Sequence, residues 1–330
     1  MIRVAINGFG RIGRAVFRIG WEDPKIEFVA INDLASTENL AYLLKHDTVY
    51  RTWWKDVRVE GNDLIVEGKR IKVFSELDPE KLPWKELGID VVVESTGKFT
   101  DVNLAKKHLI AGAKKVLVSA PTKNGGKMII RGINEHEYDK ETDHIVTIGS
   151  CTTNCAAPVL KVLNDNLGIE NALLTTIHAY TSTQALVDRP NKKHFRRGRA
   201  AAYNIVPTTT GAAEAVIRVL PELKGKFDAV SVRVPVLCGS IIDVVAKVKK
   251  ETSVEEVNGL FKEAAESSLK GILQYTEEEL VSSDIIGSPY SAIFDSKMTR
   301  VSGNLVKVMA WYDNEWGYST RLVETLKLLL

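Results

Sequence analysis

The sequence predicts an α/β fold class: a doubly wound, mostly parallel sheet in the first half and an α+β second half with a largely antiparallel sheet. Short apolar strands alternate with helical patterns up to about residue 150. The run Ile89–Glu94 is almost continuously apolar, as in a parallel strand covered on both faces. Later strands, such as Phe227–Val236 and Ser240–Lys249, alternate apolar and polar side chains instead. The 330 residues predict about two domains, which we place at 1–150 and 151–314, followed by a helix at 315–330.

Composition and charge narrow the functional class. A net charge of +2 is too small to favour nucleic acid as the primary partner. Three cysteines do not make a disulfide framework, and without a CxxC pair they are a poor zinc set, so we expect no metal. The chain begins in a strand pattern and holds no long apolar run. These features predict a cytoplasmic protein without a membrane span.

A glycine-rich turn follows the first strand pattern. Gly8, Gly10 and Gly13 form GxGxxG between a strand and a helix, and Asp33 ends the next strand, twenty residues after Gly13. Gly8 permits the tight turn, Gly10 lets a pyrophosphate approach the backbone, and Gly13 lets helix and strand pack closely. An acid at the distance of Asp33 accepts the ribose hydroxyls of NAD. We therefore predict a Rossmann domain that binds NAD through Gly8, Gly10, Arg11, Ile12, Gly13 and Asp33.

Small residues end two further strands of this half. Thr96 and Gly97 follow Ile89–Glu94, and Ser119 follows Lys115–Val118. In a doubly wound sheet the ligand binds at the carboxyl ends of the strands, so these residues are candidates to contact the cofactor. Each of them taken alone fits an ordinary turn equally well. The segment 47–73 predicts an insertion of hairpins.

A cysteine stands where a helix is expected to begin. Ser150-Cys151-Thr152-Thr153-Asn154-Cys155 precedes an apolar run, with Pro158 leaving open a kink or a later start. A thiol at a helix N-terminus faces the positive end of the dipole, and we expect this to lower its pKa. The alternative is a small buried core cysteine. His178, at the end of the strand pattern 172–177, is either the base beside this thiol or a core histidine.

Basic and hydroxyl residues gather in the second half. The segment 183–199 is rich in arginine and lysine and is either a solvated surface or an anion site. Pro207–Gly211 predicts a helix start in which threonine hydroxyls and free N–H groups form another anion site. Arg233 lies in the strand pattern that follows.

Six motifs, spread over essentially the whole chain, together resemble those of a known enzyme family. They are NGFGRIGR at Asn7–Arg14, SCTTNC at Ser150–Cys155, TTIHAYT at Thr175–Thr181, PTTTGAA at Pro207–Ala213, RVP at Arg233–Pro235 and WYDNEWGYS at Trp311–Ser319. The chain resembles the phosphorylating glyceraldehyde-3-phosphate dehydrogenases. The resemblance implies conversion of D-glyceraldehyde 3-phosphate to 1,3-bisphosphoglycerate with NAD and inorganic phosphate, through a cysteine thioester.

The resemblance also implies residue roles and an assembly. Cys151 would be the nucleophile, His178 its acid/base partner, and Asn314 would orient the nicotinamide amide. The substrate phosphate would bind Thr181, Arg197 and Arg233, and inorganic phosphate would bind Ser150, Thr152, Thr210 and Gly211. An irregular loop would span about 180–203, the last helix would pack on the first domain, and the enzyme would be a homotetramer.

Cofactor choice and reaction each leave an alternative. Asp33 favours NAD, whereas Arg189, where relatives that use NAD often carry leucine or glycine, favours a weak use of NADP. In the resembled fold the loop that carries Arg189 approaches the cofactor of a neighbouring subunit. The nearest rival enzyme is an erythrose-4-phosphate dehydrogenase. A non-enzymatic alternative is a catalytically inactive protein that binds nucleotide or RNA. The presence of both Cys151 and His178 argues against this alternative.

Overall fold

The computed structural model describes residues 1–192 and 194–330, which divide into two compact units. Unit 1 consists of Met1–Ile129, His136–Gly149 and Ser319–Leu330, and unit 2 of Ile130–Glu135 and Ser150–Tyr318. The chain thus enters unit 2 just before Cys151 and returns to unit 1 with its last residues.

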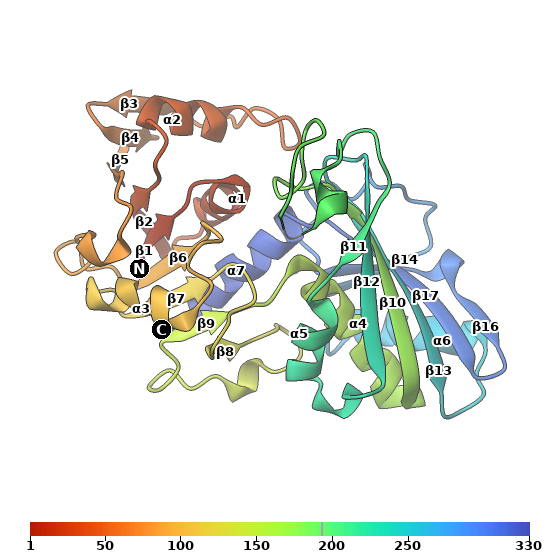
Figure 1. Ribbon diagram of the computed structural model, residues 1–330. Helices are drawn as coiled ribbons and strands as arrows, with labels where there is room; N and C mark the ends of the chain where they lie inside the picture. The colour runs from red at the N-terminus through yellow and green to blue at the C-terminus, as the bar shows by residue number, and fades with distance from the viewer. Residues whose placement is uncertain (193) are drawn as a thin grey trace. The chain divides into compact units, whose positions relative to one another are not determined.

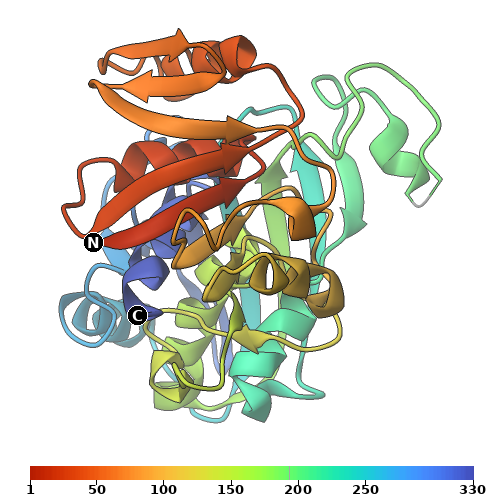
Figure 2. The same ribbon diagram turned by 90° about the vertical axis from the view of Figure 1, so that its left-hand side faces the viewer.

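Unit 1 is built on a nine-stranded sheet in the order β3-β4-β5-β2-β1-β6-β7-β9-β8 (Figure 1). The strands are β1 (Ile2–Asn7), β2 (Ile26–Asn32), β3 (Val57–Glu60), β4 (Asp63–Val66), β5 (Lys69–Phe74), β6 (Val91–Glu94), β7 (Lys115–Val118), β8 (Lys127–Met128) and β9 (Ile145–Thr147). Every pair from β5 to β8 is parallel, and only the β3-β4-β5 hairpins are antiparallel. The red and orange strands that lie side by side in Figure 2 are this end of the sheet. The predicted doubly wound sheet and the hairpin insertion are confirmed.

The helices of unit 1 follow from capping and apolar contacts. They are α1 (Arg11–Gly20), α2 (Thr37–Lys45), α3 (Val102–Ile110) and, from Ser319 onward, α7 (Trp316–Leu328). Ser36 caps α2, and Asp101 caps α3. One core cluster joins β1 and β6 to Trp84, and another joins α3 to β7. The end of α7 is fixed to the rest of unit 1 where Tyr138 donates to the Leu329 carbonyl at 2.9 Å and Lys327 pairs with Asp23 at 2.8 Å.

Unit 2 holds an eight-stranded mixed sheet in the order β11-β12-β10-β13-β17-β15-β14, with β16 paired to β17. The strands are β10 (Ile169–Ala179), β11 (Val206–Thr209), β12 (Phe227–Val234), β13 (Ser240–Val248), β14 (Leu273–Thr276), β15 (Ala292–Asp295), β16 (Arg300–Ser302) and β17 (Leu305–Tyr312). Most pairs are antiparallel, as predicted, but β10 pairs with β12 and β14 with β15 in parallel. The helices are α4 (Cys151–Leu167), α5 (Ala212–Val219) and α6 (Val254–Glu266).

The helix predicted after Pro207–Gly211 is confirmed, and the residues just before it form a strand. Pro207, Thr208 and Thr209 belong to edge strand β11, and α5 begins only at Ala212. Proline is compatible with an edge strand, and the ladder to β12 holds the threonines extended. Pro158, by contrast, does not end α4, which continues for seventeen residues from Cys151.

We predict that Gly13→Ala destabilises the fold whereas Gly10→Ala does not. A Cβ on Gly13 would lie 2.3 Å from the Gly8 carbonyl oxygen, but a Cβ on Gly10 would meet nothing within 4 Å. The backbone shift that Gly13→Ala forces should cost about 1–3 kcal/mol in the free energy of unfolding. Urea denaturation of both variants measures this difference. Equal stabilities would contradict the close packing of the turn.

Candidate active site and cofactor site

The turn between β1 and α1 has the geometry that the glycine motif predicts. Gly8 has a φ of 92° and donates its N–H to the Asn32 carbonyl at 2.8 Å. A Cβ on Gly8 would lie 2.7 Å from the Thr96 amide nitrogen, so the turn and the end of β6 are in close contact. At Gly10, the N-cap residue of α1, no side chain caps the helix. N–H groups in the first turn of a helix have no partners within the helix and can bind an anion, so this helix start is suited to one.

A pocket of about 270 Å³ lies beside this turn. Four of the residues predicted to bind the cofactor line it: Gly8, Gly10, Asp33 and Thr96. The Asp33 carboxylate is held in place because Oδ2 accepts the Phe9 N–H at 2.7 Å and Oδ1 accepts the Ala35 N–H at 3.0 Å. Each of its oxygens keeps a second lone pair for a ribose hydroxyl.

The other residues predicted to bind the cofactor lie outside the lining of this pocket. Arg11 and Ile12 open helix α1, and the Arg11 guanidinium donates to Asp47 at 2.5 Å. Gly97 has a φ of 71°, and the Ser119 N–H donates to the Glu94 carbonyl at 2.9 Å. Asn314 belongs to unit 2, where its Oδ1 accepts from the Ser240 hydroxyl at 2.9 Å and the Gly239 N–H at 3.2 Å. This bonding assigns Oδ1 as the acceptor and leaves the side-chain NH₂ as a donor.

Sequence reasoning missed eight residues that line the pocket. They are Asn7, Asn32, Leu34, Glu76, Leu77, Ser95, Lys98 and Phe99. Asn7 and Asn32 carried a usable signal because each ends a parallel strand beside a predicted site residue. Taken together, the open space at Gly10, the helix start without a side-chain cap and the Asp33 carboxylate fit a dinucleotide.

Cys151 is the first residue of α4, and a capping box defines that start. The Ser150 hydroxyl accepts the Thr153 N–H at 3.1 Å, and Thr153 Oγ1 accepts the Ser150 N–H at 3.4 Å. Asn154 Nδ2 donates to the Ser150 carbonyl at 2.9 Å. The three cysteines are free thiols; Cys155 and Cys238 are buried, whereas Cys151 is partly exposed.

The structure brings Cys151, His178 and Arg233 together. Cys151 Sγ lies 3.4 Å from His178 Nε2, and His178 is 3 % exposed. His178 and Arg233 are opposite each other in the parallel register of β10 and β12. His178 Nδ1 lies 2.6 Å from the Ala179 carbonyl oxygen, while Arg233 Nη1 lies 3.0 Å from that oxygen and 2.7 Å from Nδ1. Arg233 Nη1 and His178 Nδ1 can both donate to the Ala179 carbonyl, and with Nδ1 as a donor the lone pair of Nε2 faces the thiol.

Burial controls the charges in this cluster. Burial raises the pKa of the Cys151 thiol, and the Arg233 charge opposes this rise. Burial, followed by the Arg233 charge, lowers the pKa of His178 to about 3, against the bond to Ala179. The thiol pKa that we expected from the helix start alone is therefore wrong in direction for this conformation. Here Cys151 and His178 form a neutral, hydrogen-bonded pair.

Tyr312 is a further member of the cluster that the sequence did not predict. Its hydroxyl lies 3.0 Å from Thr152 Oγ1 and 2.8 Å from Thr176 Oγ1, and its ring packs edge-on against His178. Thr152 is thus fixed from strand β17 as well as by its place in α4. No local pattern announces this contact because the two residues are 160 positions apart.

The remaining predicted anion-site residues lie in the segment 180–203 and directly after β11. Arg197 donates from Nε to Thr208 Oγ1 at 2.8 Å and from Nη2 to the Thr209 carbonyl at 2.9 Å. Its charge acts on Arg233, although no hydrogen bond joins the two. Arg233 Nε is buried and has no partner among the described residues, which suits an anion.

Three other predicted members show only local contacts. Thr181 Oγ1 lies 2.9 Å from Thr183 Oγ1, Thr210 Oγ1 accepts the Ala212 N–H at 3.2 Å, and Gly211 is the N-cap residue of α5. In the basic loop, Asp188 pairs with Arg199 at 2.7 Å rather than with Arg189. Lys193 of this run lies outside the described residues.

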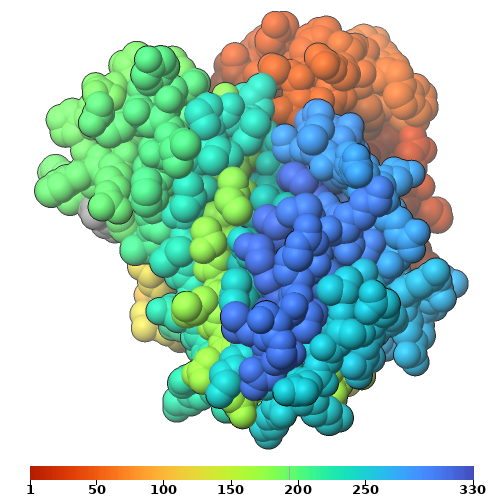
Figure 3. Space-filling model, turned by 90° about the vertical axis from the view of Figure 1, so that its right-hand side faces the viewer, coloured from red at the N-terminus to blue at the C-terminus, as the bar shows by residue number. Residues whose placement is uncertain are grey.

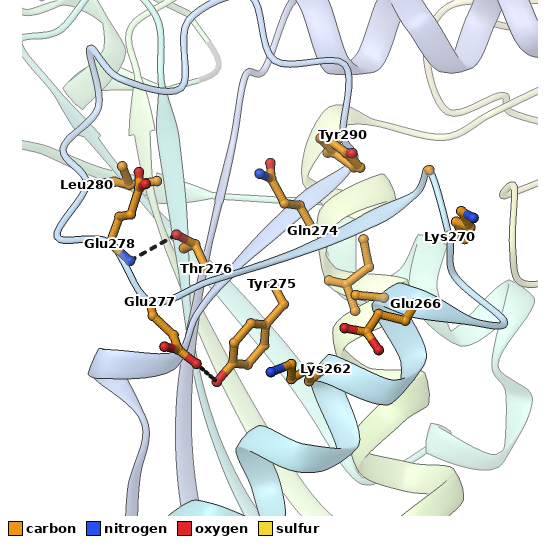
Figure 4. A pocket seen from close by; sticks show the side chains of 13 residues that line it. Lys262, Glu266, Lys270, Gln274, Tyr275, Thr276, Glu277, Glu278, Leu280 and Tyr290 are labelled. Atoms are coloured by element: carbon orange, nitrogen blue, oxygen red, sulfur yellow. Dashed lines mark hydrogen bonds between the residues drawn. The ribbon is translucent and has the colours of Figure 1, made fainter.

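A pocket of about 790 Å³ in unit 2 contains none of the predicted site residues. It lies between α6 and edge strand β14, where Tyr275 donates to Glu277 at 3.3 Å (Figure 4). Within residues 1–192 and 194–330, no group of three or more His, Cys, Asp or Glu side chains could hold a metal ion. In the same residues, no helix is long and apolar enough to cross a membrane.

A Rossmann unit with a dinucleotide pocket, and a second unit with a thiol, an imidazole and converging arginines, define an oxidoreductase of the nicotinamide-dependent class. Two domain models match the chain: the NAD binding domain of glyceraldehyde 3-phosphate dehydrogenase over residues 2–102 and its C-terminal domain over residues 150–314. The chain belongs to the glyceraldehyde 3-phosphate dehydrogenase family. It is accordingly an NAD-dependent oxidoreductase.

Curated relatives match the sequence of this chain over almost its full length. The chain is 53% identical to glyceraldehyde-3-phosphate dehydrogenase of Geobacillus stearothermophilus over 98% of this chain and 96% of the relative. It is 54% identical to glyceraldehyde-3-phosphate dehydrogenase 2 of Streptomyces avermitilis, with 98% and 97% covered. It is 55% identical to the Thermotoga maritima enzyme of the same name, with 100% and 99% covered.

We predict that one equivalent of iodoacetamide labels Cys151 before the other two thiols. Cys155 and Cys238 are 0 % and 3 % exposed, so the reagent reaches them only after local opening. Peptide mass spectrometry after partial alkylation locates the label. The matched variant Cys155→Ser, one helical turn further on, should be labelled as fast as the wild type. Label found mainly on Cys155 or Cys238 would contradict the accessibility of Cys151.

Proposed function

We propose that this chain catalyses the NAD-dependent oxidative phosphorylation of D-glyceraldehyde 3-phosphate to 1,3-bisphosphoglycerate, with Cys151 as its nucleophile. The observation that carries the proposal is the 3.4 Å contact between Cys151 Sγ and His178 Nε2, with Arg233 on the far side of the ring. A thiolate suits this reaction because it both adds to a carbonyl and leaves from one. The relatives named above all carry the name of this enzyme.

The proton steps follow from the neutral pair. His178 Nε2 takes the thiol proton, and the Cys151 sulfur adds to the aldehyde carbon. His178 returns this proton to the new oxyanion, so that a thiohemiacetal forms, and then removes it again as the carbon is oxidised. NAD, when bound, accepts the hydride in this step. A thioester on Cys151 remains, and N–H groups at the start of α4 stabilise the charge on its carbonyl oxygen during each attack.

Inorganic phosphate completes the reaction. A phosphate oxygen attacks the thioester carbonyl, the Cys151 thiolate leaves, and His178 returns a proton to it. Ser150, Thr152, Thr210 and Gly211 offer hydroxyl and N–H donors for this attacking phosphate, whereas Thr181, Arg197 and Arg233 bind the phosphate of the substrate. The unpartnered Nε of Arg233 supports this division.

Substrate binding should also prepare His178 for its role. Burial, and after it the Arg233 charge, lowers the pKa of His178 to about 3, so the imidazole resists a proton. A substrate phosphate bound to Arg233 neutralises that charge and raises the pKa of His178. The general base thus becomes effective when the correct substrate is present.

We assign NAD as the preferred cofactor and propose a weak use of NADP. Asp33, fixed by two backbone N–H groups, would repel a 2′-phosphate. Arg189 is exposed, and its sequence neighbour Asp188 is already paired with Arg199, so this acid does not compete with a phosphate for Arg189. Asn314 presents its NH₂ group as the donor for the nicotinamide amide.

We further propose a cytoplasmic homotetramer. Large apolar side chains are exposed on the loop 180–203 and the strands beside it, among them Leu186, Phe195, Tyr203, Ile205 and Leu173 at 67–88 % exposure. Figure 3 shows the loop as the green mass at the upper left, next to stripes of sheet residues that reach the surface. A patch of this kind favours an interface. The free thiols fit a reducing compartment.

We predict that Cys151→Ser and His178→Asn reduce activity to different extents, because one removes the nucleophile and the other removes the general base. Cys151→Ser should abolish phosphate-dependent NADH formation and leave NAD binding intact, because Cys151 does not line the dinucleotide pocket. His178→Asn should slow turnover by about 10²–10⁴-fold. Absorbance at 340 nm follows both.

Cys155→Ser is the control and should stay active. A His178→Asn variant with a near-normal rate would make His178 a core histidine. Higher kcat/KM for erythrose 4-phosphate, or turnover independent of phosphate, would favour the rival dehydrogenase.

We predict that Asp33→Ala improves kcat/KM for NADP, and that Arg189→Leu reduces what NADP use the wild type has. The first change removes the charge that repels a 2′-phosphate, and the second removes the charge that attracts it. Steady-state kinetics with both cofactors give the comparison. A wild type that prefers NADP would reverse the ranking of the two residues.

We predict a particle of four chains in solution. Burial of the exposed apolar residues should drive association. Light scattering should therefore give about four times the chain mass of 36.6 kDa. A mass of one chain would refute the assembly while leaving the chemistry of the site untouched.

A further inference from the structure

A buried polar network crosses the sheet of unit 1 under the cofactor pocket. It contains Asn7, Asn32, Glu94, His108 and Trp84, which are all between 0 % and 4 % exposed. Asn7, Asn32 and Glu94 end the neighbouring strands β1, β2 and β6, and His108 reaches Glu94 from α3. Buried polar groups are costly unless they are hydrogen-bonded, so the pattern of bonds shows what this network holds in place.

Trp84 fixes the proton of His108. The indole N–H of Trp84 can only donate, and it lies 3.0 Å from His108 Nδ1. Nδ1 is therefore the acceptor, and the ring carries its proton on Nε2. Nε2 lies 3.0 Å from Glu94 Oε2, so His108 is a permanent donor to this carboxylate. His108 Nε2 also lies 3.4 Å from Asn7 Nδ2. This contact is not a hydrogen bond, because both nitrogens donate to the same oxygen, Glu94 Oε2.

The two carboxylate oxygens of Glu94 accept hydrogen bonds from different groups, one from core residues and one from a residue that lines the pocket. Oε2 accepts from His108 and from Asn7 Nδ2, the latter at 2.5 Å. Oε1 accepts the Thr96 N–H at 2.8 Å and also the Thr96 hydroxyl. Four donors thus converge on one buried carboxylate, which fixes its rotamer and, through it, the start of the segment after β6.

The network continues into the wall of the pocket. Asn7 Oδ1 accepts from Asn32 Nδ2 at 2.7 Å, and the Asn32 amide exchanges two bonds with the Glu76 main chain, at 2.8 and 2.9 Å. Asn7, Asn32, Glu76 and Thr96 all line the pocket that contains Asp33. Thr96, which Glu94 holds, is also the residue that a Cβ on Gly8 would strike.

We infer that His108, oriented by Trp84, is a positioning residue for NAD: it holds Glu94 so that the ends of β6, β1 and β2 keep the spacing that the adenosine half requires. His108 itself does not line the pocket and acts only through Glu94. The inference rests on the NAD part of the function and not on the aldehyde chemistry. Its effect should therefore appear in cofactor affinity, and equally for NAD and for ADP-ribose.

The test is calorimetric titration of the full chain with NAD and with ADP-ribose, at a temperature where circular dichroism shows each variant folded. His108→Phe keeps the ring but removes both hydrogen bonds, and its Kd for both ligands should rise roughly tenfold or more. His108→Gln supplies an amide donor for Glu94 and an acceptor for Trp84, so it should restore the Kd to within about threefold of the wild type. A His108→Phe variant that binds NAD like the wild type would overturn the inference, whatever its Tm.

A second variant keeps the inference testable if His108→Phe does not fold. Trp84→Phe removes only the bond to His108 Nδ1 and preserves an aromatic ring in the core. Its matched control is Trp53→Phe, a buried indole of the same unit that packs on Phe17 and Arg18. Trp84→Phe should weaken NAD severalfold and Trp53→Phe should not. Equal Kd values of these two variants for NAD would show that His108 stabilises the fold but does not position the cofactor. The titration uses no aldehyde, so it distinguishes a failure of this inference from a failure of the proposed activity.

Discussion

The catalytic unit depends on where helix α4 begins. The reciprocal bonds between Ser150 and Thr153 set that point, so Cys151 becomes the first helical residue rather than part of the preceding loop. A start one residue later would rotate the thiol by about 100° around the helix axis, away from His178. The helix is buried along most of its length, from Thr152 to Leu167, so packing holds the start firmly. The reactive group is thereby placed by a capping interaction and not by its own contacts.

The pocket of unit 1 and the thiol site of unit 2 are formed in different ways. The pocket of unit 1 is lined by a glycine turn and by strand ends, which the buried carboxylate of Glu94 ties together. The thiol site is made from side chains whose neighbours are set by strand register, since β10 and β12 place Arg233 opposite His178. Burial raises the pKa of Cys151 and lowers that of His178, so these two groups are neutral beside the charged Arg233.

Local patterns predict much of this structure, and long-range contacts account for what they miss. The turn at Gly8, Gly10 and Gly13 is encoded within a few residues and is predicted in full. The contacts of Tyr312 with Thr152 and of Asn7 with Glu94 join segments distant in the chain, and no local pattern signals their pairing. The helix start alone predicts a lowered thiol pKa, and burial, which only the packed structure reveals, reverses that direction. Thr208 and Thr209 are strand residues because β12 pairs with them.

The central claim is that Cys151 carries the acyl group between oxidation and phosphorylation. Intact-protein mass spectrometry tests it directly, on enzyme mixed with NAD and D-glyceraldehyde 3-phosphate in a buffer free of phosphate. The account predicts one 3-phosphoglyceroyl group per chain, located on the Cys151 peptide and released when inorganic phosphate is added. An unmodified chain that has nonetheless formed NADH, or an acyl group on another residue, would contradict it.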